Sequence, residues 1–599
     1  MTTINRTFSF QNELPSLPIP PLSSTKSKLL EWIEPIVSLE QFNKTSDVIE
    51  RFFEIGGEAE KLQTKLQEWD QMRTGSWLAP FWEDSYLRHR DSLPYSMNFN
   101  ILLKNDHYKN RYTIAEMAGR VSFLVTELYH AIIDEEVEPE TVRGKPLDMS
   151  QYKNFFRSVR IPRLDRDAFH VADFDKKNNH VVILFKNNVY KVQVTNRDGV
   201  IYHSLDIAAA IEATILAEQE EGVNVGIFTT AERNMAAEVY DMLNTSKENA
   251  EILRTIADSL VIISIDEESK DSEEALKNLM LNANNKYFDK TIEIIITKQS
   301  ELGFNVEHCA VDGTSISAVI SHVSKGLKED LPQFVQTFEQ PLVEKQKWEL
   351  STETLDILNQ FQEDHLQQKN KYYLRSEIFT DFGADEIKNM NFSPDAFFHM
   401  ALQIAQYRTY GELKSVYEPV SVRYFYEGRT ECARATSMEK RNLVEALESE
   451  SESNETLYAL MQKVSTAHSE RIKDCQKGFG VERHMYGLKQ ISHLFGTELG
   501  LKELPEIFQD KGYLAMRHDF LSTSGMTYQN VKYRMFPPVV DDGHGVAYIL
   551  LEDSITINIS SYIENKNNAN QLMEHMINAL NELRMIAIDR KRLLSVRGS

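Results

Sequence analysis

The run GFNVEHCAVDG, residues 303–313, decides both the fold and the candidate chemistry of this chain. A short apolar stretch precedes His308, Asp312 follows four residues later, and Gly313 lets the backbone turn. Histidine changes protonation near neutral pH. A carboxylate beside one ring nitrogen can fix its tautomer while the other nitrogen removes a proton from a hydroxyl or thiol. The pattern favours His308 as a general base, and the alternative is a buried histidine bonded to a backbone carbonyl.

Around this run, strand and helix patterns alternate, which predicts an α/β fold. Strand-like runs occur between residues 178 and 206, at LVIISI (260–265) and at TIEIIIT (291–297), with helical patterns at 207–218, 231–243 and 272–281. The alternation repeats after residue 393. It comprises a helix at 393–411, a strand-like run at 421–428, helices through 488, strands at 519–524, 545–553 and 554–562, and a last helix near 571–594.

The chain begins differently, with a proline-rich stretch at 14–22 that we expect to be an extended arm. Apolar residues at helical spacing follow from 25 to 72, with an interruption near Pro35. A chain of 599 residues exceeds what one hydrophobic core usually organises. We therefore expect three parts: an arm with helices at 1–80 that packs with the second domain, a first domain at 81–349 carrying His308, and a second domain at 350–599.

Composition excludes several classes of function. The chain has 66 Lys and Arg against 90 Asp and Glu, a net charge of −24, which disfavours nucleic acid and anionic membranes as partners. No apolar run approaches a membrane span, and neither end carries a targeting signal, so the expectation is a soluble cytoplasmic protein. Three distant cysteines (Cys309, Cys432 and Cys475) form no CxxC pattern, and we expect no disulfide framework and no metal site.

Nine segments in sequence order carry a resemblance to a known family. HxxxDG is typical of the coenzyme A-dependent acyltransferase superfamily, and the chain resembles its carnitine/choline O-acyltransferase branch across essentially its whole length. The matching segments are LPSLPIPPL (14–22), FWEDSYL (81–87), KYFDKTIEIII (286–296), EHCAVDG (307–313), SPDAFFHMALQIAQYRTYG (393–411), YEPVSVRYFYEGRTE (417–431), ERHMYGLK (482–489), LSTS (521–524) and FPPVVDDGHGVAY (536–548).

The resemblance implies two similar α/β domains, each a mixed β-sheet packed with helices, with an active-site tunnel at their interface. It implies a transferase that moves a short acyl group, such as that of acetyl-CoA, between coenzyme A and carnitine, and hence a place in fatty acid metabolism. His308 would be the base, and Ser524 of the STS motif would stabilise the oxyanion. Asp312 stands where many relatives have glutamate, which keeps the charge on a shorter side chain.

Carnitine differs from choline by its carboxylate, so a cation in the alcohol pocket discriminates between them. By resemblance, Arg483 is that cation and joins Tyr417 and Thr430 around the carboxylate, with Ser522 part of the same pocket. The alternative is that Arg483 forms a surface ion pair with its neighbours Glu482 and His484.

The coenzyme A site is less complete. The resemblance assigns Asp395 and Glu418 to coenzyme A contacts. Relatives have two lysines before the SPDAF helix that bind phosphate, whereas this chain has Lys388 at one position and Ala384 at the other. Either the affinity is lower or a replacement cation comes from elsewhere in the fold.

Acyl length is the last implication. Where long-chain enzymes typically have glycine, at the opening of the acyl tunnel, this chain has Arg534. A buried arginine against a methylene chain is costly, so we expect short acyl groups to be preferred. Arg534 could instead turn outward to solvent, or attract an acyl group that ends in a carboxylate.

The leading hypothesis is therefore a carnitine O-acyltransferase that acts on small molecules as a monomer. One alternative is the same chemistry on choline or another amino alcohol. A second is a catalytically silent binding protein of the same fold, for which Ala384 is the one hint.

Overall fold

The computed structural model describes residues 6–267, 269–330 and 340–597, and the chain divides into two compact units. Unit 1 comprises Met1–Glu13, Glu83–Tyr372 and Gln529–Pro537, and unit 2 comprises Leu14–Trp82, Tyr373–Tyr528 and Pro538–Ser599. The helical segment near the start of the chain thus belongs to the same unit as the C-terminal half. The boundaries expected at residues 80 and 349 stay predictions.

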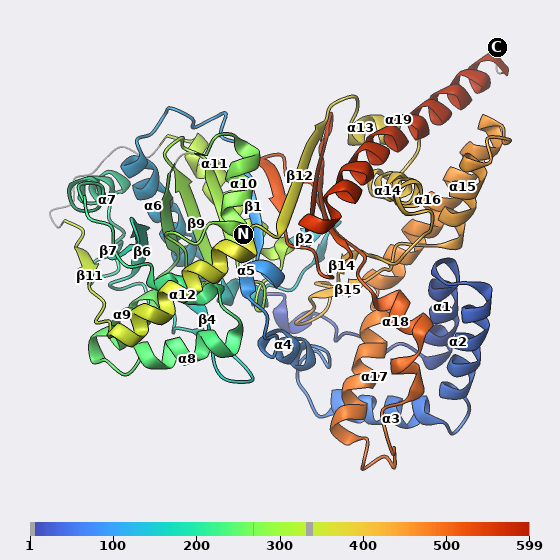
Figure 1. Ribbon diagram of the computed structural model, residues 1–599, viewed down its shortest axis with the longest axis horizontal. Helices are drawn as coiled ribbons and strands as arrows, with labels where there is room; N and C mark the ends of the chain where they lie inside the picture. Colours follow the sequence, from blue (N-terminus) through green and yellow to red (C-terminus); the bar gives the residue numbers. More distant parts are fainter. Residues whose placement is uncertain (1–5, 268, 331–339, 598–599) are drawn as a thin grey trace, which may run out of the picture. The chain divides into compact units, whose positions relative to one another are not determined.

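An eight-stranded mixed sheet forms the centre of unit 1 (Figure 1). Its order is β11 (Val343–Gln346), β7 (Asn188–Gln193), β6 (His180–Phe185), β8 (Ile262–Asp266), β9 (Ile292–Thr297), β10 (Leu302–Val306), β1 (Phe99–Leu103) and β17 (Val531–Met535). β6, β8 and β9 run parallel, and the remaining neighbours pair antiparallel. β9 is buried at every position, as expected for a strand covered on both faces.

Helices and two short hairpins complete unit 1. α10 packs on β1, β10 and β17, while α6 packs on β9, α7 and α11. The elements are α5 (Leu93–Ser96), α6 (Ile114–Ile133), α7 (Ser204–Ile211), α8 (Arg233–Leu243), α9 (Lys247–Asp258), α10 (Ser272–Leu281), α11 (Gly313–Lys328) and α12 (Thr352–Lys369), with hairpins β2/β3 (Thr141–Val142, Lys145–Pro146) and β4/β5 (Ser158–Ile161, Ala168–Val171). α4 (Ala79–Leu87) lies where the chain passes between units.

Unit 2 contains a five-stranded mixed sheet in the order β12 (Tyr372–Phe379), β19 (Ile555–Tyr562), β18 (His544–Leu550), β16 (Leu521–Met526) and β13 (Val416–Tyr417). α14 (Pro394–Tyr410) packs side by side with the long α19 (Lys566–Arg597), as Figure 1 shows. The first turn of α14 begins with a proline, and Gly411 ends the helix at φ +73°, a left-handed conformation that glycine adopts without strain.

The other elements of unit 2 form a helical cluster and a small hairpin. They are α1 (Leu22–Ile33), α2 (Leu39–Phe52), α3 (Glu58–Gln71), α13 (Ala384–Asn389), β14 (Pro419–Ser421), β15 (Thr430–Cys432), α15 (Met438–Glu448), α16 (Asn454–Gln476), α17 (Glu482–Phe495) and α18 (Lys511–Arg517). α17 packs on α3, and its apolar residues share one core with the first three helices. Within the described residues, no helix is both long and apolar enough to span a bilayer.

The predicted α/β fold, with a mixed sheet and covering helices in each of two units, is confirmed. The extended arm and the break near Pro35 are also found, because Pro15–Pro21 contains no helix or strand and a short 3₁₀ turn at Glu34–Ile36 separates α1 from α2. The strand expected at 421–428 is wrong. Only Ser421 belongs to a strand, and a turn follows in which Val422 and Gly428 approach closely, joining β14 to β15.

Candidate active site

His308 lies between the end of β10 and the start of α11. Its Nδ1 is 2.7 Å from the carbonyl oxygen of Val311, so Nδ1 carries a proton and donates it. In that tautomer Nε2 holds the lone pair that a general base needs. The rings of Phe99 and Tyr86 lie 5.1 and 5.5 Å from the imidazole ring, and the His308 side chain is 31% exposed. The imidazole is thus oriented from one side and accessible to a small molecule.

Asp312 supports this loop rather than binding the imidazole closely. One carboxylate oxygen is 3.8 Å from Nδ1 of His308, while the other accepts a hydrogen bond of 2.8 Å from the side-chain amide of Gln151. A second hydrogen bond joins the same two residues: the side-chain carbonyl oxygen of Gln151 accepts the backbone N–H of Asp312 at 2.8 Å. Asp312 is also the N-cap residue of α11. The sequence pattern identified Asp312 but gave no signal for Gln151, which lies about 160 residues earlier.

A buried ion network lies beside the loop of unit 1 that carries His308. Arg160 contacts Asp167 at 2.6 Å and Glu307 at 3.2 Å, and Arg233 contacts Asp167 at 2.7 Å and Asp289 at 2.8 Å; the side chains of all five are fully buried. Burial alone would raise the pKa of Asp167, but Arg233 and Arg160 outweigh it and lower the pKa. Each guanidinium is therefore matched by carboxylates of the protein itself.

This network reaches His308 through its neighbour in sequence. Both carboxylate oxygens of Glu307 lie 3.2 Å from the backbone N–H of Cys309, and Arg160 also donates to the carbonyl oxygen of Tyr86 at 2.7 Å. The Glu307 side chain thus links the backbone of Cys309, the residue after His308, to a buried arginine.

In unit 2, Arg483 is buried, with 5% of its surface exposed. Its Nε donates to the backbone carbonyl of Thr430 at 2.9 Å, its Nη2 donates to the hydroxyl of Tyr417 at 3.0 Å, and its guanidinium stacks 3.9 Å from the ring of Trp82. None of these partners carries a charge. The expected grouping of Arg483, Tyr417 and Thr430 is present, although Thr430 contributes its backbone.

The neighbouring arginine of unit 2 behaves differently. Arg434 pairs with Glu482 at 3.1 Å and with Asp519 at 2.5 Å, and Arg517 binds Glu482 at 2.9 Å. Glu482 therefore does not pair with Arg483, and the surface ion pair considered from the sequence does not form. His484 is also occupied elsewhere, by Thr25 and Gln63.

One carboxylate does lie close to the backbone of this pocket. Glu431 accepts the backbone N–H of Arg483 at 3.1 Å and that of Cys432 at 2.8 Å. Burial raises the pKa of Glu431 to about 7, although Arg483 opposes the shift. Burial likewise raises the pKa of Tyr417 to about 12, again against Arg483, so Tyr417 stays protonated at neutral pH.

The STS motif occupies β16, next to the strand that carries Tyr417. Ser522 pairs with Tyr417 in the parallel register, and residues in register share one face of a sheet. Alternation puts Ser524 on that face as well, whereas Thr523 points the other way and its hydroxyl donates to the backbone carbonyl of Tyr417 at 2.8 Å. The unit thus brings Tyr417, Ser522 and Arg483 together, with Ser524 one step further along the strand.

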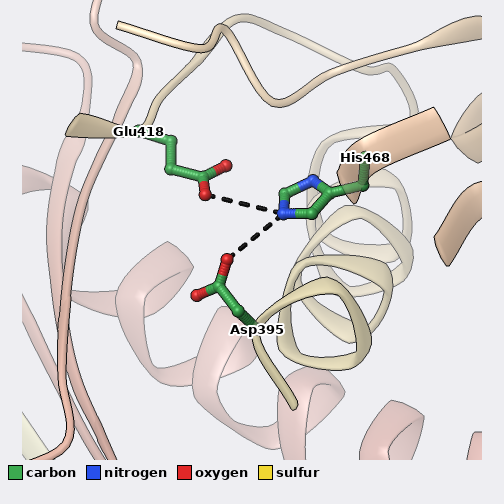
Figure 2. Close-up of side chains that lie close together, drawn as sticks. All are labelled: Asp395, Glu418 and His468. Atoms are coloured by element: carbon green, nitrogen blue, oxygen red, sulfur yellow. Dashed lines mark hydrogen bonds and ion pairs between the residues drawn. The ribbon is translucent and has the colours of Figure 1, made fainter. Parts of the chain in front are cut away.

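Asp395 and Glu418 gather around a histidine that the sequence did not single out. Nε2 of His468 lies 3.2 Å from Asp395 and 3.5 Å from Glu418, and Figure 2 shows the two carboxylates approaching the same ring nitrogen. On the other side of the ring, Nζ of Lys440 lies 3.1 Å from Nδ1. All three partners of His468 come from different segments of unit 2.

Asp395, Glu418 and His468 could hold a metal ion. A charged lysine donates and cannot accept, so Nδ1 of His468 accepts from Lys440 and Nε2 carries the proton that faces the carboxylates. A protonated nitrogen is not a metal ligand. Burial lowers the pKa of Lys440 to about 7, although Glu418 and Asp395 oppose the shift. The arrangement therefore favours a hydrogen-bonded network while Lys440 is charged, and the expected absence of a metal stays a prediction.

The remaining expected residues lie in different surroundings. Lys388, on α13, is about 60% exposed and pairs with Asp385 at 3.1 Å, while Ala384 is buried at the start of that helix. Arg534 is 7% exposed on β17, so it does not turn outward to solvent. Its guanidinium carbon is 5.9 Å from the ring of Phe99, the same ring that contacts His308.

Comparison with known proteins identifies the family. Residues 17–582 match the model of the choline/carnitine O-acyltransferase family, and the chain belongs to that family. It is therefore an acyltransferase by class, as the sequence motifs indicated.

Three relatives show how wide the family is. Carnitine O-acetyltransferase of Columba livia is 29% identical, covering 96% of this chain and 94% of its own. Choline O-acetyltransferase of Danio rerio is 29% identical, covering 92% and 89%, and mitochondrial carnitine O-palmitoyltransferase 2 of Xenopus tropicalis is 28% identical, covering 93% and 89%. Because these identities are nearly equal, the alcohol substrate and the acyl length have to be argued from the site. The cytoplasmic location stays a prediction.

Proposed function

We propose that this chain transfers a short acyl group between coenzyme A and the hydroxyl of carnitine. The observation that carries the choice of carnitine is the state of Arg483. Its guanidinium is buried and hydrogen-bonded to a carbonyl and a phenol, and within the described residues it forms no ion pair with a carboxylate. A buried cation with neutral partners favours an anionic group of the substrate, and carnitine has a carboxylate where choline has none.

The chemistry follows from the tautomer of His308. Val311 holds the proton on Nδ1, so Nε2 accepts the proton of the carnitine hydroxyl as its oxygen attacks the thioester carbon. The carbon–sulfur bond then breaks, and Nε2 returns the proton to the departing sulfur. Transfer in the opposite direction uses the same nitrogen with the thiol as the first donor.

The other residues take supporting roles in the proposal. The hydroxyl of Ser524 donates to the oxyanion of the tetrahedral intermediate, and Ser522 completes the carnitine pocket beside Tyr417. Asp395 and Glu418 accept hydrogen bonds from coenzyme A. Lys388 contacts a phosphate of coenzyme A. To do so it must give up its ion pair with Asp385, which weakens this contact.

Acyl length follows from Arg534. Since its side chain is buried against Phe99 and beside the first residue of α11, a long methylene chain would have to displace or surround a guanidinium. Acetyl and propionyl groups are therefore preferred over palmitoyl in this proposal.

The test is to mix the purified protein with acetyl-CoA and either carnitine or choline, following both free thiol and the mass of the ester. We expect acetylcarnitine at a kcat/KM at least about tenfold above that for acetylcholine, the effect of one charge-assisted hydrogen bond. A preference for choline would mean that choline, and not carnitine, is the acyl acceptor. If neither alcohol yields an ester, the result would support a silent binding protein. Palmitoyl transfer as fast as acetyl transfer would contradict the acyl-length part alone.

A further inference from the structure

Asp395, Glu418 and His468 come from three separate segments of unit 2 and converge on one point (Figure 2). Asp395 lies in the first turn of α14, Glu418 lies between β13 and β14, and His468 lies within α16. Nε2 of His468 is 3.2 Å from Oδ2 of Asp395 and 3.5 Å from Oε1 of Glu418. One imidazole and two carboxylates form a donor set that Zn²⁺ takes in proteins.

The spacing of these three atoms fits a tetrahedral ion. Zn²⁺ binds histidine nitrogen and carboxylate oxygen at about 2.0–2.2 Å, so two of its ligand atoms lie about 3.4 Å apart. Both distances from Nε2 match this edge, and all three atoms lie within 4.8 Å of one another. A small closure of the two carboxylates therefore gives three of the four ligands of such an ion.

Glu418 supplies a second, independent observation. Its surface is 5% exposed, and within the described residues its Oε2 has no hydrogen-bond partner. Nε2 of His399 lies 3.4 Å from this oxygen, beyond the about 2.7–3.2 Å of a good N–H···O hydrogen bond. A buried carboxylate oxygen without a partner is costly, and a cation beside the carboxylate compensates it. The Asp395 side chain is 39% exposed, so an ion can reach the cluster from that side.

We propose that Asp395, Glu418 and His468 bind one divalent metal ion of the Zn²⁺ class, with water as the fourth ligand. The ion takes the place of the proton on Nε2, which passes to solvent. In the same exchange the ammonium group of Lys440 gives a proton to Nδ1, 3.1 Å away, so the ring stays neutral and its second nitrogen stays hydrogen-bonded. The cysteine pattern gave no signal for this site, because none of its ligands is a cysteine.

The experiment treats the full chain with EDTA, removes the chelator, and titrates the protein with Zn²⁺ by calorimetry and with Co²⁺ by visible absorption. Four-coordinate Co²⁺ absorbs far more strongly than six-coordinate Co²⁺, so the band reports the geometry as well as the binding. We expect one ion per chain. The inference does not depend on the proposed acyl transfer, because no acyl-CoA is present.

Three variants test the ligands. Asp395→Asn and Glu418→Gln keep the size of each side chain and remove its charge, and each should weaken binding at least about tenfold, as the loss of a metal contact does. Lys440→Met should instead strengthen binding several-fold, because it removes a positive charge beside the ligating ring and lets Nδ1 carry the proton.

Asp542→Asn is the matched control. It makes the same change in the same unit, beside His518, whose Nε2 lies 2.7 Å from the Asp542 carboxylate. Among the described residues no third ligand joins this pair, so the variant should bind the ion like the wild type. The inference would be overturned by a wild type without the Co²⁺ band, or by an affinity that Asp395→Asn and Glu418→Gln leave unchanged. An equal loss in Asp542→Asn would show binding to scattered surface groups, and it too would overturn the site.

Discussion

Two buried arginines, Arg160 in unit 1 and Arg483 in unit 2, differ in how the protein compensates their charge. Arg160 is surrounded by charge of opposite sign, with Asp167 and Glu307 at 2.6 and 3.2 Å. Arg483 is also buried but donates to a carbonyl and a phenol. A buried charge is stable only when it is compensated. Carboxylates of the protein compensate Arg160, whereas the hydrogen-bond partners of Arg483 are neutral, so an anionic ligand would compensate its charge.

The two surroundings also differ in what they position. The Arg160 network holds the backbone after His308, through Glu307 to Cys309, and the backbone of Tyr86, whose ring lies 5.5 Å from the ring of His308. It therefore acts on the base indirectly. Arg483 points its own guanidinium at the face of the sheet that carries Tyr417 and Ser522. Mutations should separate these roles, with stability dominating in unit 1 and substrate affinity in unit 2.

The largest effect is expected for His308→Ala. General base catalysis contributes about 10²- to 10⁴-fold, so kcat for acetyl transfer should fall by about that factor. The fold should persist, because His308 is partly exposed and the hydrogen bond of its Nδ1 to Val311 lies within the same loop. Near-normal turnover in this variant would contradict the assignment of His308 as the general base.

His322→Ala serves as its control. His322 is a half-buried histidine of α11 that pairs with Glu127 at 3.2 Å, within the same unit. Its replacement should leave kcat within about twofold of the wild type, since a surface pair contributes little. A large loss in both variants would indicate general damage to unit 1.

Arg160→Met tests the structural half of the comparison. Removing Arg160 leaves the buried carboxylate of Glu307 without its arginine, while Asp167 keeps Arg233. Breaking a buried ion pair in this way costs about 3–5 kcal/mol of unfolding free energy. Urea denaturation would measure this, with Arg163→Met as control, since Arg163 pairs with Asp241 at the surface and should cost under about 1 kcal/mol. Equal stability of the two variants would contradict the assignment of the network.

The contrast between the two arginines was only partly predictable from sequence. Arg483 stood out because it falls in the segment ERHMYGLK, while Tyr417 and Thr430 fall in the segment YEPVSVRYFYEGRTE, and both segments resemble the family. His308 stood out because Asp312 and Gly313 follow it at fixed spacing. Arg160 and Gln151 lie in unremarkable local sequence and meet the loop around His308 only through long-range packing. Local periodicity and motif spacing carry no information about such contacts.

The fold, too, was only partly predictable from the sequence. Long helices and continuous apolar strands such as β9 were predicted, because their pattern is set by burial on one side or on both. β17 was not, since VKYRM mixes polar and apolar residues and pairs with β1, more than 400 residues earlier. His468 and Lys440 were missed for a related reason: polar residues on helices read as solvent-facing until packing buries them.

Arg483→Asn tests the binding half. Removing the cation should raise the KM for carnitine about 10- to 100-fold with a smaller change in kcat, and should leave the KM for choline nearly unchanged. Unfolding free energy should fall by only about 1–2 kcal/mol, because the groups left behind are neutral. Arg441→Asn, an exposed pair with Glu445, is the control. Unchanged carnitine kinetics would mean that the pocket is assigned wrongly.

The smallest and most specific effect concerns Glu431, whose carboxylate accepts the backbone N–H of Arg483. Its pKa is raised by burial to about 7, against an ordinary value of 4.5. The folded state therefore binds more protons than the unfolded state between these values, so the free energy of unfolding falls as pH rises through that window, by up to about 3 kcal/mol. In Glu431→Gln this dependence should disappear.

The same titration should appear in substrate affinity. Above about pH 7 an ionised Glu431 offsets the positive charge of Arg483, so the KM for carnitine should rise several-fold between pH 6 and pH 8. Choline has no carboxylate, and its KM should not rise over that range, which separates an effect on the pocket from an effect on the base. Glu431→Gln should bind carnitine with a nearly constant KM. A wild-type KM for carnitine that is flat over this range, or an equal rise for choline, would show that Glu431 does not modulate the charge that Arg483 presents.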